Sequence, residues 1–114
     1  MSTVSFVVHV LLAGALAGSA TAALTRYEPV LVGMARAGVP ESVLPLLGTL
    51  KAAAALGLLV GLAVPWIGTA AAAGTVVYFA GAIVTHLRAR DYALAPASSF
   101  AVLAVAALAL GVAA

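Results

Sequence analysis

The chain has 114 residues, of which 66% are hydrophobic and only 7% are charged, and its formal net charge is +2. A soluble globule of this length has too little interior to hide so much apolar surface, whereas lipid accepts it on the outside of every helix, so the composition predicts an integral membrane protein. The absence of cysteine excludes disulfides, thiol catalysis and iron–sulfur or thiolate–zinc sites made by this chain. The few, scattered cations predict no nucleic-acid partner.

Residues 3–24 carry no formal charge. At about 1.5 Å per residue they are long enough to cross a hydrocarbon core of about 30 Å, so we expect a first membrane span. The small residues at 18–23 also resemble the end of a secretory signal peptide, but no Lys or Arg precedes the apolar run, which favours the span. Near the start of this segment, His9 is either an interfacial or packed imidazole or a proton relay.

Residues 25–42 form a polar connection that contains proline and glycine. Pro29 suits the first turn of a helix and Gly38 suits its end, so we expect a short helix between them that lies on the membrane surface. The apolar residues at helical spacing in this segment are Val30, Leu31, Met34 and Ala37. We expect the carboxylates of Glu28 and Glu41 to be solvated.

The second span is expected at about residues 43–64, where Pro45 falls in the first turn and is tolerated. Lys51 lies about 12 Å from the start of this span. A charge at mid-membrane costs at least about 2.5 kcal/mol, so this lysine needs a partner or a purpose. Its ammonium either forms a functional site inside the bundle, reaches the loop-side interface on its long stem, or pairs with Glu28 or Glu41. Glycines at a spacing that lets helices approach closely occur in the first two spans: Gly14, Gly18, Gly57 and Gly61.

The connection at 64–66 is very short and uncharged, so the second and third spans must form an antiparallel hairpin. We expect the third span at 66–87. Because the two helices run in opposite directions, Tyr78 falls at a depth close to that of Lys51, and His86 falls at the same end of the hairpin. The phenol is either an ordinary packed aromatic or a partner of the ammonium or of a bound molecule, and the imidazole is either satisfied by backbone or functional.

A polar link at 88–92 leads to a shorter fourth span at 95–112. The arginines are confined to the two connections on one side of the bundle: Arg26, Arg36, Arg88 and Arg90. The positive-inside rule therefore predicts that the loops 25–42 and 88–95 are cytoplasmic and that both termini lie outside. The pair at 88 and 90 is either topogenic and solvated or binds an anionic ligand or lipid headgroup.

The sequence predicts an all-α integral membrane protein, a four-helix up-down bundle formed by one domain of residues 1–114. Four motifs follow one another along the chain: Gly38-Val39-Pro40, Gly48-x-x-Lys51, Gly81-Ala82-x-x-x-His86 and Arg88-x-Arg90-Asp91. By their order and spacing, nearly the whole chain resembles the DoxX-like family of small four-helix membrane proteins. The family often has a Gly-x-x-Lys near the end of the first helix, where this chain reads Ala22-Ala23-Leu24-Thr25-Arg26. Arg26 either substitutes for that lysine or has a different role.

The family name comes from a subunit of a thiosulfate:quinone oxidoreductase, other members are linked to oxidative-stress defence, and related eukaryotic proteins act as assembly chaperones for membrane receptors. By this analogy, the resemblance implies a bacterial plasma-membrane protein that binds a quinone or other small apolar molecule in a redox or stress-response system. Lys51 would hold a carbonyl or anion, Tyr78 and His86 would assist proton transfer, and Arg88 would be a further ligand contact.

The sequence contains no convincing His pair for haem and no nucleotide-binding glycine motif, so we expect no metal site, and electrons would come from a partner protein or a bound cofactor. Whether the protein is an enzyme stays open. The alternative function is an assembly or structural subunit that docks on other membrane helices. The expected partners are the lipid bilayer, a small apolar molecule, a redox or membrane-complex protein and a second copy of the chain.

Overall fold

A computed structural model describes residues 2–113, and every regular element within that range is helical. Four helical segments of this range are long and apolar enough to cross a membrane. They are α1 (Thr3–Leu24), α3 (Leu44–Val60) together with the preceding 3-10 turn η1 (Glu41–Val43), α4 (Pro65–Arg88) and α5 (Ala95–Ala113). The short helix α2 (Glu28–Arg36) follows α1. The predicted all-α membrane bundle is therefore confirmed.

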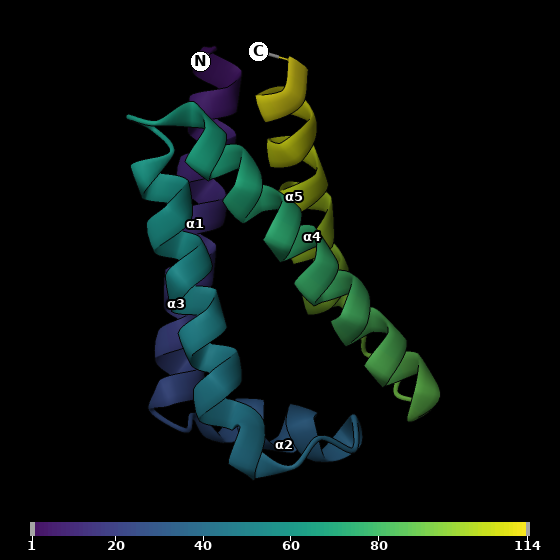
Figure 1. Cartoon of the computed structure of the whole chain (residues 1–114). Coiled ribbons are helices and arrows are strands. Elements are labelled where there is room, and N and C mark those ends of the chain that lie inside the picture. The colour runs from purple at the N-terminus through teal and green to yellow at the C-terminus, as the bar shows by residue number, and fades with distance from the viewer. Residues whose placement is uncertain (1, 114) are drawn as a thin grey trace.

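The four long helices pack as a ring (Figure 1). Helix α1 contacts α3, α3 contacts α4, α4 contacts α5, and α5 contacts α1. Consecutive long helices run in opposite directions, so the start of α1 and the end of α5 lie together at one end of the molecule. Helix α2 lies across the opposite end, which we call the loop end. The link between α4 and α5 lies at this end too. This is an up-down arrangement.

Helix α3 ends at Val60, before the end at residue 64 that the hydropathy suggested. A turn at residues 61–64 replaces the last helical turn. The ring of Pro65 disfavours the helical conformation at the residue before it, and Val64 accordingly has φ −123° and ψ 87°. The same proline begins α4, where its missing N–H needs no partner. The chain therefore reverses within four residues.

Small residues let the helices approach closely near this turn. A Cβ atom on Gly61, the first residue after α3, would clash with Cα of Gly68, so the chain at the end of α3 and the first turn of α4 touch backbone to backbone there. From that contact the two helices diverge toward the loop end (Figure 1). Gly14 and Gly18, in contrast, have no atom within 4 Å of an ideal Cβ and face away from the other helices. This glycine pair does not serve the close packing within the chain that its spacing suggested.

The core of the bundle combines alanines and leucines with two stacked phenyl rings. Its buried members are Leu12, Ala13, Leu16, Ala55, Leu58, Ala72, Phe79, Ala97, Ala104 and Ala107. The ring of Phe79 on α4 stacks on Phe100 of α5 with centroids 4.8 Å apart and planes 4° apart. The stack fixes the position of α4 next to the residues that line the cavities described below.

Helix α2 closes the loop end of the bundle. Its buried Met34 belongs to a second apolar cluster with Ala23 of α1 and Leu44 of α3. The apolar face of α2 therefore packs against the ends of α1 and α3. The helix ends at Arg36, and Gly38 follows it in the left-handed conformation with φ 71°. Arg26 pairs with Glu41 over 2.6 Å and ties the end of α1 to the segment before α3.

Candidate functional site

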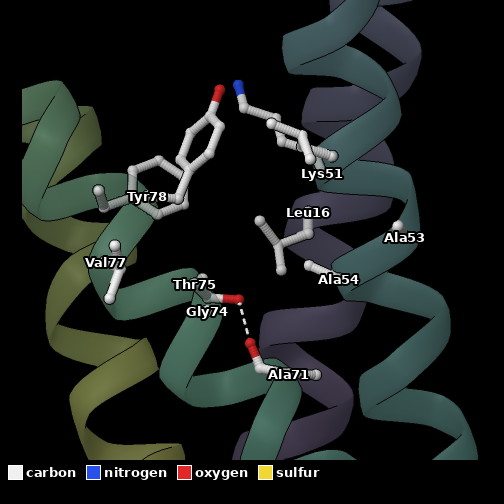
Figure 2. A pocket seen from close by; sticks show the side chains of 11 residues that line it. Leu16, Lys51, Ala53, Ala54, Ala71, Gly74, Thr75, Val77 and Tyr78 are labelled. Carbon is white, nitrogen blue, oxygen red and sulfur yellow. Dashed lines mark hydrogen bonds between the residues drawn. The ribbon is translucent and has the colours of Figure 1, made fainter.

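Two cavities meet at the side chains of Lys51 and Tyr78. The smaller, about 390 Å³, lies between α3 and α4, with Leu16 of α1 behind it (Figure 2). The larger, about 650 Å³, extends to the loop end between α2, α3, α4 and the start of α5. Both cavities are lined by Leu50, Lys51, Tyr78 and Phe79. Their volumes are in the range of small-molecule sites, which runs from about 300 to 1,000 Å³.

The ammonium of Lys51 points into the bundle. Its Nζ donates a hydrogen bond of 2.8 Å to Oγ of Ser19 on α1. The same Nζ lies 5.8 Å from the ring centroid of Tyr78 and 6.0 Å from that of Phe79, at the outer limit of a cation–π contact. Glu41, one of the two carboxylates that the sequence offered as partners, bonds to Arg26 instead. Because an ammonium has three donors, two remain for a bound molecule.

Tyr78 faces Lys51 across the junction of the two cavities. Figure 2 shows the phenol oxygen and the ammonium extending toward the same side. Within residues 2–113 the Tyr78 hydroxyl has no hydrogen-bond partner, so it is available both to donate and to accept. The Phe79 ring meets the Tyr78 ring edge to face, with centroids 4.9 Å apart, and supports it from behind. The sequence predicts that Lys51 and Tyr78 lie at similar depth in the bundle, and in the structure their side chains lie close together.

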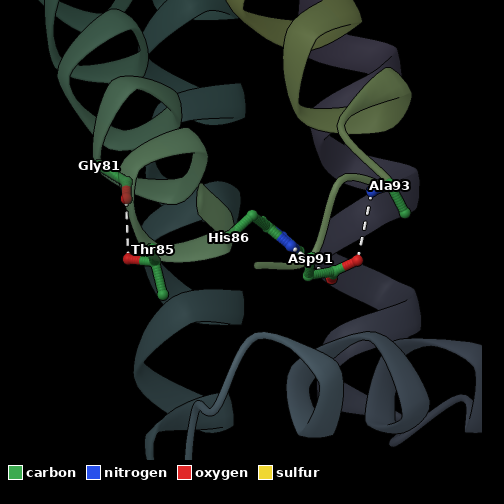
Figure 3. A network of polar contacts seen from close by, with 5 residues as sticks. All are labelled: Gly81, Thr85, His86, Asp91 and Ala93. Carbon is green, nitrogen blue, oxygen red and sulfur yellow. Dashed lines mark hydrogen bonds and ion pairs between the residues drawn. The ribbon is translucent and has the colours of Figure 1, made fainter. Parts of the chain in front are cut away.

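His86 lines the larger cavity together with Lys51 and Tyr78, and it is held by a neighbour in the following link (Figure 3). Its Nδ1 donates a hydrogen bond of 2.8 Å to Oδ2 of Asp91. The second carboxylate oxygen accepts a bond of 3.2 Å from the backbone N–H of Ala93. The side chains are only 22% and 10% exposed. The hydrogen bond from His86, with the weaker backbone bond, lowers the pKa of Asp91 below its usual value.

This pairing also fixes the chemistry of the imidazole. An ionised carboxylate only accepts hydrogen bonds, so Nδ1 of His86 carries a proton. In the neutral ring, Nε2 is then the acceptor, and an imidazole oriented in this way is suited to exchange protons at that nitrogen. The orientation of the ring comes from Asp91, which lies five residues further along the chain.

Two other residues considered from the sequence lie away from this site. Arg88, at the end of α4, is exposed and is not among the described residues that line the two cavities. His9 is 1% exposed in α1, and its Nδ1 donates to the carbonyl oxygen of Ser5 over 2.7 Å. His9 precedes Ser19 by ten positions, or about 15 Å along the helix. It is a packed histidine near the start of α1, separate from the two cavities.

Sequence reasoning missed Ser19 and Asp91. Ser19 was considered only as one of the small residues near the end of α1, and nothing in its own neighbourhood distinguishes it from a packing residue. It accepts a hydrogen bond from Lys51 because α1 and α3 pack side by side. For Asp91 a signal did exist, because it is the only carboxylate in the link after α4 and stands close in sequence to His86.

A family model described as the DoxX-like family matches residues 7–110. The chain belongs to the DoxX-like family. No curated protein and no solved structure matches the chain.

The Gly48-x-x-Lys51 motif of this DoxX-like protein has a steric basis. A Cβ atom on Gly48 would lie 2.8 Å from Cγ of Leu24 and 3.3 Å from Cβ of Ala23. Glycine therefore lets α3 approach the end of α1. Residues three apart share a helix face, so the same approach brings Lys51 to Ser19. Arg26 lies near the end of α1, the region in which the family often has a lysine. Its guanidinium pairs with Glu41 at the loop end, and Arg26 is not among the described residues that line the two cavities.

Proposed function

We propose that this DoxX-like membrane protein binds a quinone, or another small apolar molecule with a hydrogen-bond-accepting head, in the cavities around Lys51. The molecule would serve a membrane-associated redox or stress-response system. One observation carries the proposal: an ammonium inside the bundle has two donors left and lies beside two aromatic rings and a cavity of about 650 Å³. A carbonyl oxygen would accept from Lys51, and the flat ring would lie against Tyr78 or Phe79.

The energetics support a ligand over a purely structural lysine. Translocon scales put the cost of a lysine at mid-membrane at about 2.5 kcal/mol or more. Hydrogen bonds between membrane helices contribute only about 0.6 kcal/mol on average, so the bond to Ser19 offsets a fraction of that cost. No carboxylate among residues 2–113 forms an ion pair with Lys51. A ligand that accepts the remaining hydrogens would supply the missing stabilisation.

In this proposal the other residues have distinct roles. The Tyr78 hydroxyl donates to or accepts from the head group, and Nε2 of His86 exchanges protons with it from the loop end. Arg88 contributes to topology instead of touching the ligand. We further propose a bacterial plasma-membrane location with the loops 25–42 and 88–95 in the cytoplasm, because those loops hold all the arginines.

The test is a binding titration of decylubiquinone to the purified protein in lipid nanodiscs, followed by native mass spectrometry. Lys51→Met keeps the unbranched stem and removes the donors. A hydrogen bond from a charged donor contributes about 1.5–3 kcal/mol, so we expect Kd to rise tenfold or more. Arg88→Met is the matched control, since it also removes one cation, and it should leave Kd unchanged. Equal Kd values for the native protein and Lys51→Met would refute the proposal.

A second function, an assembly or structural subunit, is supported by one specific observation. Gly14 and Gly18 present an open small-residue face on α1, the kind of face on which another membrane helix can pack closely. In that case Lys51→Met would disturb a complex and not ligand binding. If the native protein carries no quinone, and both Gly14→Phe and Lys51→Met abolish association with a co-purifying protein, the subunit function is the correct one.

A further inference from the structure

The smaller cavity opens at the outer surface of the bundle between α3 and α4, because several of the residues that line it are exposed. The exposed residues along its outer side are Leu50, Ala53, Gly74 and Val77. The side chains of Leu50 and Val77 are 46% and 72% exposed. Both lie in the middle part of segments that are apolar and of membrane length, Glu41–Val60 and Pro65–Arg88. The outer side of this cavity therefore faces the hydrocarbon of the bilayer.

The polar groups of this cavity lie at one end only. Lys51 and the Tyr78 hydroxyl are at its junction with the larger cavity. Thr75, the other polar side chain in the wall, donates its hydroxyl hydrogen to the carbonyl of Ala71 over 2.8 Å and is thereby satisfied within its own helix (Figure 2). The rest of the wall presents carbon atoms. This gradient fits an amphiphile with an accepting head and an apolar tail.

We propose that the ligand carries a long alkyl or isoprenoid tail and enters the site sideways from the bilayer, between α3 and α4. Its head lies at Lys51 and its tail leaves past Gly74 into the lipid. The opening is the cavity between α3 and α4, which lies where the two helices diverge toward the loop end. This inference rests on the proposed function, and it adds the ligand's tail and its route.

Gly74 is the position at which the route can be blocked with least harm to the fold. An ideal Cβ there meets no atom within 4 Å, so a large side chain has room to project from α4. Gly74→Phe would fill the opening. Ala53→Phe would do the same from the α3 side, where the residue is also exposed. Gly14→Phe is the matched control, because Gly14 is equally open but lines neither cavity.

Two quinones separate the tail from the head. Decylubiquinone has a ten-carbon tail, and duroquinone has only methyl groups. Each is titrated against the native protein and the variants in nanodiscs, with native mass spectrometry as the readout. We expect Gly74→Phe and Ala53→Phe to raise the Kd of decylubiquinone at least tenfold and to change the Kd of duroquinone less than twofold. Gly14→Phe should change neither value.

Three results would overturn the inference. If neither quinone binds the native protein, the proposed function fails and the route fails with it. If both quinones bind but Gly74→Phe and Ala53→Phe leave decylubiquinone unaffected, the route alone is wrong. In that event Gly81→Phe, at an open position in the larger cavity, should identify a tail that leaves at the loop end. If Gly74→Phe weakens both quinones equally, it damages the head-group site, and a lateral tail is again refuted.

Discussion

The close contact between α3 and α4 leads to a quantitative prediction for Gly61→Ala. The new Cβ would clash with Cα of Gly68 and would lie 2.5 Å from its backbone N. Ordinary carbon contacts are about 3.5–4.0 Å, so the helices must separate by more than about 1 Å at this point. No side chain can rotate away, because the opposing atoms belong to the backbone. Overpacking of this kind costs about 1–3 kcal/mol, and we expect a loss of stability in that range.

Two other glycines provide graded controls. Gly57→Ala places its Cβ 3.0 Å from Cβ of Ala71, and a contact between two methyl groups can be relieved by a small shift. Gly14→Ala meets no atom within 4 Å. Alanine is favoured over glycine inside a helix by about 0.5–1 kcal/mol, so Gly14→Ala should stabilise the protein. The predicted order of stability is therefore Gly14→Ala, then Gly57→Ala, then Gly61→Ala.

The assay is reversible unfolding from mixed micelles by increasing mole fractions of sodium dodecyl sulfate. Far-ultraviolet circular dichroism reports the helices, and the fluorescence of Trp66, the single tryptophan, reports the α3–α4 turn. A destabilised Gly61→Ala with both signals shifted together supports the contact. If Gly61→Ala is as stable as Gly14→Ala, the backbones of α3 and α4 do not meet at Gly61 and Gly68, and the account of how the two helices diverge is wrong.

Two predictions concern the loop end. The pKa of Asp91 is lowered in the folded protein by the hydrogen bond from His86, so this stabilisation is fully present above the unfolded pKa of about 3.9 and is lost as pH falls through the lowered pKa. Asp91→Asn should be less stable than the native protein at pH 7, with the difference vanishing in acid; a difference that persists at low pH would contradict this. Arg90 follows the end of α4 in the left-handed conformation with φ 57°, and Arg90→Gly should raise the unfolding free energy by about 1 kcal/mol. Arg88→Gly, which removes the same charge from a helical position, should lower the unfolding free energy, and a gain in both variants would point to charge instead of backbone strain.

The fold was accessible from sequence because lipid imposes strong constraints on a short apolar chain. Backbone groups in hydrocarbon must be satisfied within their own segment, so the long apolar runs of this chain have to be helices. The uncharged turn at Pro65 then forces neighbouring helices to be antiparallel. The precise end of α3 was less accessible. Hydropathy continues through residues 61–64, whereas the chain already turns there because of Pro65.

The candidate site was accessible only in part. Counting residues from the turn places Lys51 and Tyr78 at similar depth, and the structure brings Nζ to 5.8 Å from the phenol ring. Counting cannot say which helix the ammonium meets, because that depends on the packing of α3 against α1. The partner proved to be Ser19. Arg88 is on the same helix as His86, but it is exposed at the end of that helix. Its position in the sequence alone therefore did not predict that it lies outside the two cavities.

The sequence alone determined the lipid environment, the helical class and the presence of a lysine and a tyrosine at matching depth, because these depend on composition, length and the direction of the chain. Only the tertiary structure decided that Lys51 turns inward to Ser19, that Asp91 orients His86, and that α3 and α4 diverge from Gly61 and Gly68 to leave a cavity between them. These features arise from contacts between residues far apart in the chain, and such contacts depend on how closely two backbones approach.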